Sequence, residues 1–291
     1  MPTPRAAVAA FGLLLLVACS HASTARPGGP IRIVATTTTL ASIAQGAAGD
    51  KADVRSLVPV GVSPEDFQPA PDAIEALRNA DVLVENGAGL EGWLDATIRN
   101  AANPKLRIVV CTDGLPVVNG NPHLWMDPVY ARAYVAKIRD ALVAADAAHA
   151  GAYRTAAAAY DKTLVALTAR TKTKINTIPA ARRTMIVFHN AFDYYARRFG
   201  LKIVGAIEPI AGAEPNPAHI ADLVRLARAE HVPAVFAEHE YSDKLARALA
   251  ESAGGLKVAF LYDDSLGTDP GTSTYVGMID TDTDTIVSAL R

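Results

Sequence analysis

Four side chains that could bind a metal ion each lie in a loop that follows a predicted β-strand. They are two carboxylates and two histidines: Glu65, His123, His189 and Asp264. In open α/β sheets, ligands bind outside the carboxyl ends of the strands, so these loops can meet at one place. Two imidazoles and two carboxylates suit Zn²⁺, Mn²⁺ or Fe²⁺, whereas a set without thiolates argues against Cu(I) and iron–sulfur chemistry. The sequence therefore predicts a site for a divalent transition metal.

Each of the four residues has a simpler interpretation when it is taken alone. His123 could be a partly buried, hydrogen-bonded histidine, and His189 could cap the helix that follows it. Glu65 could be a solvated loop acid, and Asp264, in an Asp-Asp-Ser run, has the composition of a turn or helix cap. The prediction of a metal site depends on the four occurring together.

Other polar residues are candidates to support the histidines rather than to bind the ion. A metal-bound histidine normally donates its second N–H to a carboxylate or a carbonyl group. Glu238, Glu240 and Asp127 are candidates for that acceptor, and residues 36–39 could line the same cleft. Capping and surface roles remain open for all of them.

Two series of short β-branched runs alternate with helical stretches. Such a βαβα pattern is typical of a parallel sheet covered by helices. The first series predicts strands over residues 31–36, 54–60, 81–84 and 107–111, and helices over 71–79 and 128–144. The second predicts strands over residues 184–188, 201–207, 233–237 and 257–261, and helices over 191–199, 217–230 and 242–253. The expected fold class is α/β, with two similar parallel-sheet lobes.

A long helix is expected to join the lobes. Residues 147–176 contain no proline and one glycine, Gly151, and carry an apolar stripe that includes Tyr153, Leu164 and Leu167. About 30 helical residues would reach roughly 45 Å, more than one lobe needs. We expect an N-terminal lobe over residues 31–146, a rigid linking helix over 147–178 and a C-terminal lobe over 179–291. Two helices broken near Gly151 are the alternative.

The N-terminus has the pattern of an export signal. Residues 1–18 combine one arginine with an apolar run that is too short to span a bilayer, which is typical of a signal peptide. The run Leu-Val-Ala before Cys19 resembles a bacterial lipobox, which implies cleavage there and lipidation of Cys19. Residues 19–30 would be a flexible lipidated tether. We expect a protein anchored to the outer face of the cytoplasmic membrane, or periplasmic; an ordinary signal peptide is the alternative.

The composition excludes some classes of partner. The chain has 28 Lys and Arg against 30 Asp and Glu, which gives no reason to expect nucleic-acid binding. Cys111 is the one cysteine besides Cys19, so no internal disulfide can form after lipidation. Half of the residues are apolar, enough for one or two large cores, and we expect a monomer.

Several short stretches together resemble a known family. They lie at residues 57–64, 121–128, 189–195, 200–201, 214–217, 236–238 and 264–266. The chain resembles the bacterial ABC-transporter solute-binding proteins for zinc and manganese, cluster A-I or solute-binding family 9. The resemblance implies two α/β lobes joined by one rigid helix, a metal between them with one ligand from each of four loops, and delivery to an ABC permease in the cytoplasmic membrane without catalysis.

The family pattern places three of the four candidates on ligand positions and departs at the fourth. His123, His189 and Asp264 match family ligands, whereas the family usually has histidine at the position of Glu65. A carboxylate there would shift the preference toward Mn²⁺ or Fe²⁺. The long His- and acid-rich loop of many zinc-specific members does not precede His123, which also weakens the case for zinc.

Two other functions remain as alternatives. A metallohydrolase would use three protein ligands and an open position for water, as catalytic zinc sites do. The chain has no His-Glu-x-x-His helix, and four protein ligands would fill a tetrahedral site. A surface-adhesion lipoprotein would instead keep its metal as a structural element.

Overall fold

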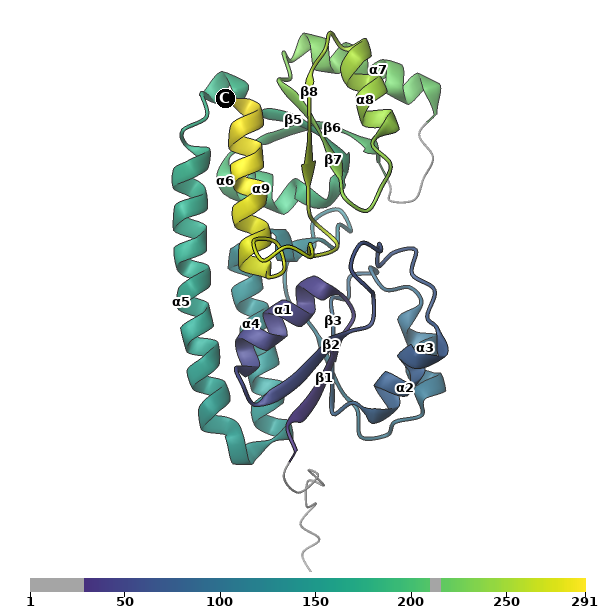
Figure 1. The fold of residues 1–291 in the computed structure, drawn as a ribbon, viewed down its shortest axis with the longest axis vertical. Helices are drawn as coiled ribbons and strands as arrows, with labels where there is room; N and C mark the ends of the chain where they lie inside the picture. The colour runs from purple at the N-terminus through teal and green to yellow at the C-terminus, as the bar shows by residue number, and fades with distance from the viewer. Residues whose placement is uncertain (1–28, 210–215) are drawn as a thin grey trace, which may run out of the picture.

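Two four-stranded parallel sheets form the two lobes of the molecule (Figure 1). The computed structural model describes residues 29–209 and 216–291, so the predicted signal peptide and Cys19 lie outside the described residues. The first sheet has the order β2-β1-β3-β4 and the second the order β6-β5-β7-β8. The strands are β1 (Ile31–Ala35), β2 (Ala52–Ser56), β3 (Val82–Glu85), β4 (Arg107–Val110), β5 (Thr184–His189), β6 (Lys202–Glu208), β7 (Ala234–Glu238) and β8 (Lys257–Leu261). The predicted α/β fold class is confirmed.

Helices cover both sheets, and the central strands are correspondingly buried. Every residue of β7 is buried, as expected for a parallel strand with both faces covered. The helices are α1 (Thr38–Ala48), α2 (Pro71–Asn79), α3 (Leu94–Ala101), α4 (Pro128–Ala145), α5 (Ala150–Ile175), α6 (Asp193–Phe199), α7 (Pro217–Ala229), α8 (Lys244–Ser252) and α9 (Tyr275–Leu290). None of the helices in the described part of the chain has the length and apolar character needed to cross a bilayer.

The helix α5 runs along one side of both lobes (Figure 1). It packs against α1 and α4 of the first lobe and against α6 and α9 of the second. A single 3₁₀ turn (Ala147–His149) precedes it, and the helix then continues through Gly151 without interruption. Its 26 residues span about 39 Å. The alternative of a break near Gly151 is therefore wrong, and the helix is shorter than the predicted residues 147–178 because a 3₁₀ turn precedes Ala150 and the α-helix ends at Ile175.

The segment after β2 differs from the prediction. A strand was expected over residues 54–60, but β2 ends at Ser56. Leu57 and Val58 still donate backbone hydrogen bonds to β1 and the residue after it, and then the chain turns outward at Gly61, whose φ is +77°. β-Branched residues continue past the end of the strand, so composition alone does not mark where the chain leaves the sheet. This segment carries Glu65.

Candidate metal centre

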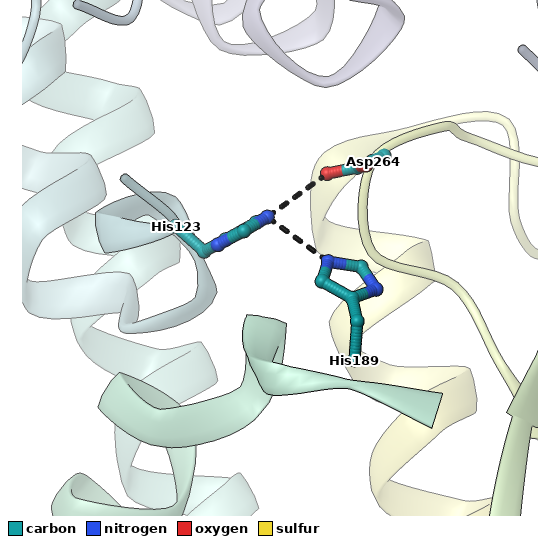
Figure 2. Close-up of side chains that lie close together, drawn as sticks. All are labelled: His123, His189 and Asp264. Atoms are coloured by element: carbon teal, nitrogen blue, oxygen red, sulfur yellow. Dashed lines mark hydrogen bonds and ion pairs between the residues drawn. The ribbon is translucent and has the colours of Figure 1, made fainter. Parts of the chain in front are cut away.

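The four predicted ligands come from four separate segments, each at or beyond the end of a strand. Glu65 lies in the loop after β2 and His123 directly before a 3₁₀ turn (Leu124–Met126), both in the first lobe. His189 is the last residue of β5, and Asp264 follows β8 in the second lobe. Figure 2 shows the side chains of His123, His189 and Asp264 pointing toward one another. One ligand atom from each of these three lies within 4.8 Å of the other two.

The distances make a compact group around Nε2 of His123. That nitrogen lies 3.1 Å from Nε2 of His189 and 3.4 Å from Oδ1 of Asp264. It lies 4.0 Å from Oε1 of Glu65. The first three side chains are almost fully buried, whereas that of Glu65 is 22% exposed. The structure thus brings all four predicted residues together, with Glu65 at the solvent side of the group.

A neighbouring amide determines how His123 presents its ring. Asn121 Oδ1 accepts hydrogen bonds from the backbone N–H of His123 at 3.0 Å and contacts its Nδ1 at 2.8 Å. The amide is oriented by Nδ2, which donates to the carbonyl of Asn190 at 2.6 Å. Because Oδ1 can only accept, Nδ1 carries the proton. The lone pair of Nε2 is therefore free to bind a cation.

The carboxylate of Glu238 orients the ring of His189 in the same way, by accepting a hydrogen bond from Nδ1. Glu238 accepts from Nδ1 of His189 at 2.7 Å through Oε2, and from its backbone N–H at 3.2 Å through Oε1. Nδ1 is again the protonated nitrogen, so the Nε2 lone pairs of the two histidines face each other at 3.1 Å. Two facing lone pairs repel unless a proton or a metal ion lies between them. A carboxylate-supported histidine of this kind is typical of metal sites.

Burial and neighbouring charges shift the pKa values of all four predicted ligands. Burial lowers the pKa of His123, whereas for His189 the charge of Glu238 outweighs burial and raises the pKa to about 10. Burial and the charge of Asp264 raise the pKa of Glu65 to about 7. Burial alone would raise the pKa of Asp264, but its close contact with His123 and the positive charges of the protonated histidines outweigh burial, so the pKa is lowered. A cation that binds among these side chains would therefore compete with protons.

Of the three carboxylates suggested as hydrogen-bond acceptors for the histidines, only Glu238 has that role in the structure. Glu238 bonds to His189, as the sequence suggested. Asp127 does not serve either histidine: it accepts from the backbone N–H of Val129 at the start of α4 and pairs with Arg198 at 2.7 Å. Both carboxylate oxygens of Glu240 are buried without a hydrogen-bond partner.

Two residues near the histidines were missed. Asn121 had a weak signal, since an asparagine two residues before a histidine can accept from the backbone N–H that follows. Asp263 had none. It is fully buried, and its Oδ2 lies 3.5 Å from Nδ1 of His189. Burial, and next the charges of Glu238 and Glu240, raise the pKa of Asp263 well above its ordinary value.

The lobes meet around the site through several polar contacts. Trp125 of the first lobe donates from Nε1 to the carbonyl of Asp263 at 3.0 Å. The backbone N–H of Gly61 donates to Oγ of Ser265 at 2.8 Å. The candidate ligands of one lobe are thus held against those of the other by bonds formed one to four residues away from them.

Known proteins are similar in sequence to this chain over most of its length. The iron-binding protein YfeA of Yersinia pestis is 34% identical over 263 residues, covering 88% of this chain and 85% of that protein. The manganese-binding lipoprotein MntA of Halalkalibacterium halodurans is 31% identical over 272 residues, covering 92% of this chain and 91% of that protein.

Solved structures agree with the fold. The periplasmic zinc-binding protein TroA of Treponema pallidum superposes with a TM-score of 0.82 at 25% identity, covering 90% of this chain and 99% of that one. A manganese-bound periplasmic metal-binding protein of Candidatus Liberibacter asiaticus has a TM-score of 0.80, also at 25% identity, and covers 90% of this chain and 100% of that one. The family model described as zinc-uptake complex component A, periplasmic, matches residues 33–289. The chain therefore belongs to this family of metal solute-binding proteins, as the resemblance in its sequence predicted.

Proposed function

We propose that the protein captures a divalent transition-metal ion between its lobes and delivers it to an ABC permease. The observation that carries this proposal is the pair of imidazole Nε2 atoms 3.1 Å apart, both left with lone pairs by their Nδ1 hydrogen bonds. Asp264 and Glu65 add carboxylate oxygens from both lobes. Such a set of two nitrogen and two oxygen donors suits a borderline or hard divalent ion.

The ion is cargo, and no reaction is catalysed. Relatives of the chain include proteins named as metal ABC transporter substrate-binding lipoproteins, such as FimA of Streptococcus parasanguinis, which is 27% identical over 270 residues. Four protein donors fill a tetrahedral site, whereas catalytic zinc keeps one position open for water. We further propose His123, His189, Asp264 and Glu65 as the ligands.

Manganese or ferrous iron is the proposed cargo ahead of zinc. Two carboxylates make the donor set harder than one with three histidines, and hard oxygen donors favour Mn²⁺ and Fe²⁺ relative to Zn²⁺. The relatives named above as iron-binding and manganese-binding support the same preference. Lipidation of Cys19 would hold the monomeric protein outside the cytoplasmic membrane, within reach of its permease.

Metal competition on the metal-stripped protein beginning at Ser20 tests this proposal. We expect His189→Ala to weaken binding of Mn²⁺ by more than the roughly 10- to 100-fold typical of outer-shell changes. His149→Ala is the matched control, because His149 lies on the exposed turn before α5 and bonds to Asp146. Equal affinities in wild type and His189→Ala would rule out this ligand set.

The Glu65→Ala variant tests the metal preference separately. If Glu65 is a ligand, its removal should weaken Mn²⁺ binding more than Zn²⁺ binding, because zinc accepts the remaining His123, His189 and Asp264. If Zn²⁺ binds tightly and the variant barely differs for either metal, Glu65 is not a ligand and zinc is the better assignment.

A further inference from the structure

The interior around His189 holds more carboxylates than one divalent ion can neutralise. Five of them have buried oxygens there: Glu65, Glu238, Glu240, Asp263 and Asp264. Within residues 29–209 and 216–291, no lysine or arginine forms an ion pair with any of the five. Once the cargo ion has displaced the proton of His189, the two histidines are neutral and add no charge. A single divalent cargo ion therefore leaves an excess of buried negative charge, which is unfavourable unless it is paired.

The excess lies on one side of the His189 ring. The cargo ligands gather at Nε2, whereas one ligand atom each from His189, Glu238 and Asp263 lies within 4.8 Å of the others at the Nδ1 side. Asp263 is 0% exposed, and neither of its carboxylate oxygens has a hydrogen-bond partner. Both oxygens of Glu240, two residues after Glu238, are also buried and unpartnered. A fully buried carboxylate without a hydrogen-bond partner, that of Asp263, thus points into the group.

We propose that Asp263 and Glu238, which are grouped at Nδ1 of His189, bind a second cation there, with the buried carboxylate of Glu240 as a further ligand. His189 keeps its Nδ1 proton on Glu238 and does not bind this ion. Each oxygen of Glu238 accepts one hydrogen bond from His189 and keeps a second lone pair for the cation. Asp263 and Glu240 contribute four oxygens that have no hydrogen-bond partner, although Oδ2 of Asp263 lies 3.5 Å from Nδ1 of His189.

Donors of this kind select the class of ion. Carboxylate oxygens without nitrogen or sulfur suit hard divalent cations such as Mg²⁺, Ca²⁺ and Mn²⁺. The second ion would therefore differ from a zinc-like cargo, while Mn²⁺ could occupy both positions. This site is separate from the proposed cargo ligands, so each can be removed by its own substitution.

Equilibrium dialysis of the metal-stripped protein against MnCl₂, with manganese counted per chain, tests the proposal. We expect two ions per chain in wild type and one in Asp263→Asn. His123→Ala should also retain one ion, because it disrupts the cargo site and leaves Asp263, Glu238 and Glu240 in place. The combined variant should bind none. Asp53→Asn is the matched control, since Asp53 is exposed on β2, and it should bind two.

The outcomes separate this site from the cargo site. One ion in wild type and none in His123→Ala would overturn the second site, because protons would then neutralise Asp263 and Glu240, and would leave the cargo proposal intact. Two ions in Asp263→Asn would also overturn it, by placing the second ion elsewhere. Glu240→Gln provides an independent variant if circular dichroism shows that Asp263→Asn does not fold, and it too should bind one ion.

Discussion

At the residue scale, the site depends on groups that set the protonation of each imidazole. Glu238 and Asn121 accept from the Nδ1 atoms, so both rings present Nε2 to the same point. The four proposed ligands could be suggested from sequence because each lies at or beyond the end of a strand and three of them match ligand positions of the family. Asn121 and Asp263 could not be assigned in the same way, since their roles depend on side-chain direction and burial. A sequence shows that Asp263 is an acid, but not that its carboxylate is fully enclosed.

Removing the charge of Glu238 should weaken metal binding without removing a ligand. In Glu238→Gln the amide oxygen can still accept from Nδ1, but the negative charge that makes His189 a stronger donor is lost. We expect the Kd for Mn²⁺ to rise about 10- to 100-fold, as measured by competition with a chelating dye. Glu251→Gln on the exposed face of α8 is the control, and an unchanged Kd in Glu238→Gln would argue against this role.

Metal affinity should rise with pH through neutrality. The pKa of His189 is raised to about 10 and that of Glu65 to about 7, so at pH 6 both hold protons that a metal must displace. Loss of one proton per ion corresponds to a roughly tenfold tighter Kd for each unit of pH. Calorimetric titrations at pH 5.5, 6.5 and 7.5 in two buffers of different ionisation enthalpy measure both the slope and the protons released. Equal affinity at pH 5.5 and 7.5 would contradict histidine ligation.

At the element scale, α5 and α9 show how one lobe is fastened to the linking helix. Arg170 bonds to both carboxylate oxygens of Asp280, and Lys174 pairs with Asp284 at 2.6 Å. Helix α9 carries the run Thr-Asp-Thr-Asp-Thr, whose residues are weak helix formers. That explains why the helix was not assigned from sequence: its stability comes from packing and from these pairs. The helices α1 and α3 were likewise not assigned, whereas α2 and α4 begin with a recognisable proline.

The apolar contacts of α5 should contribute more stability than its ion pairs. Arg170 and Asp280 are both partly exposed, and exposed pairs contribute about 0–1 kcal/mol. Leu167 is fully buried, and truncating such a leucine costs about 2–5 kcal/mol. We expect Leu167→Ala to lower the free energy of unfolding by more than Arg170→Ala does. Urea denaturation followed by circular dichroism compares them, and the reverse order would show that the ion pairs dominate.

At the scale of the whole molecule, the two lobes have sheets with the same strand order. Each sheet places its second strand at one edge and its fourth at the other, with the first and third between them. His123 follows the fourth strand of the first sheet, and Asp264 follows the fourth strand of the second. The two lobes and the helix that joins them were predictable from the repeated βα pattern. The lobe contacts were not, because bonds such as that from Trp125 to the carbonyl of Asp263 join residues 138 positions apart.

Because the proposed ligands come from both lobes, metal should stabilise the molecule as a unit. A ligand that binds only the folded state adds about 2.7 kcal/mol when its free concentration is 100 times Kd. We expect the midpoint of thermal unfolding to rise progressively with added Mn²⁺ and to return after chelation, as followed by circular dichroism. A metal that cannot be removed without unfolding would indicate a structural ion rather than cargo.

The hydrogen bonds that the two Nδ1–H groups donate have a spectroscopic consequence. Both protons lie inside the protein on acceptors that hold them in place, so they exchange slowly with solvent. In a cobalt(II)-substituted protein, the unpaired electrons would shift the proton resonances of both rings far from the ordinary range. Two exchangeable, strongly shifted signals should therefore appear in the spectrum in H₂O and fade slowly in D₂O, one reporting on each lobe. Loss of one signal in Asn121→Ala would assign it to His123.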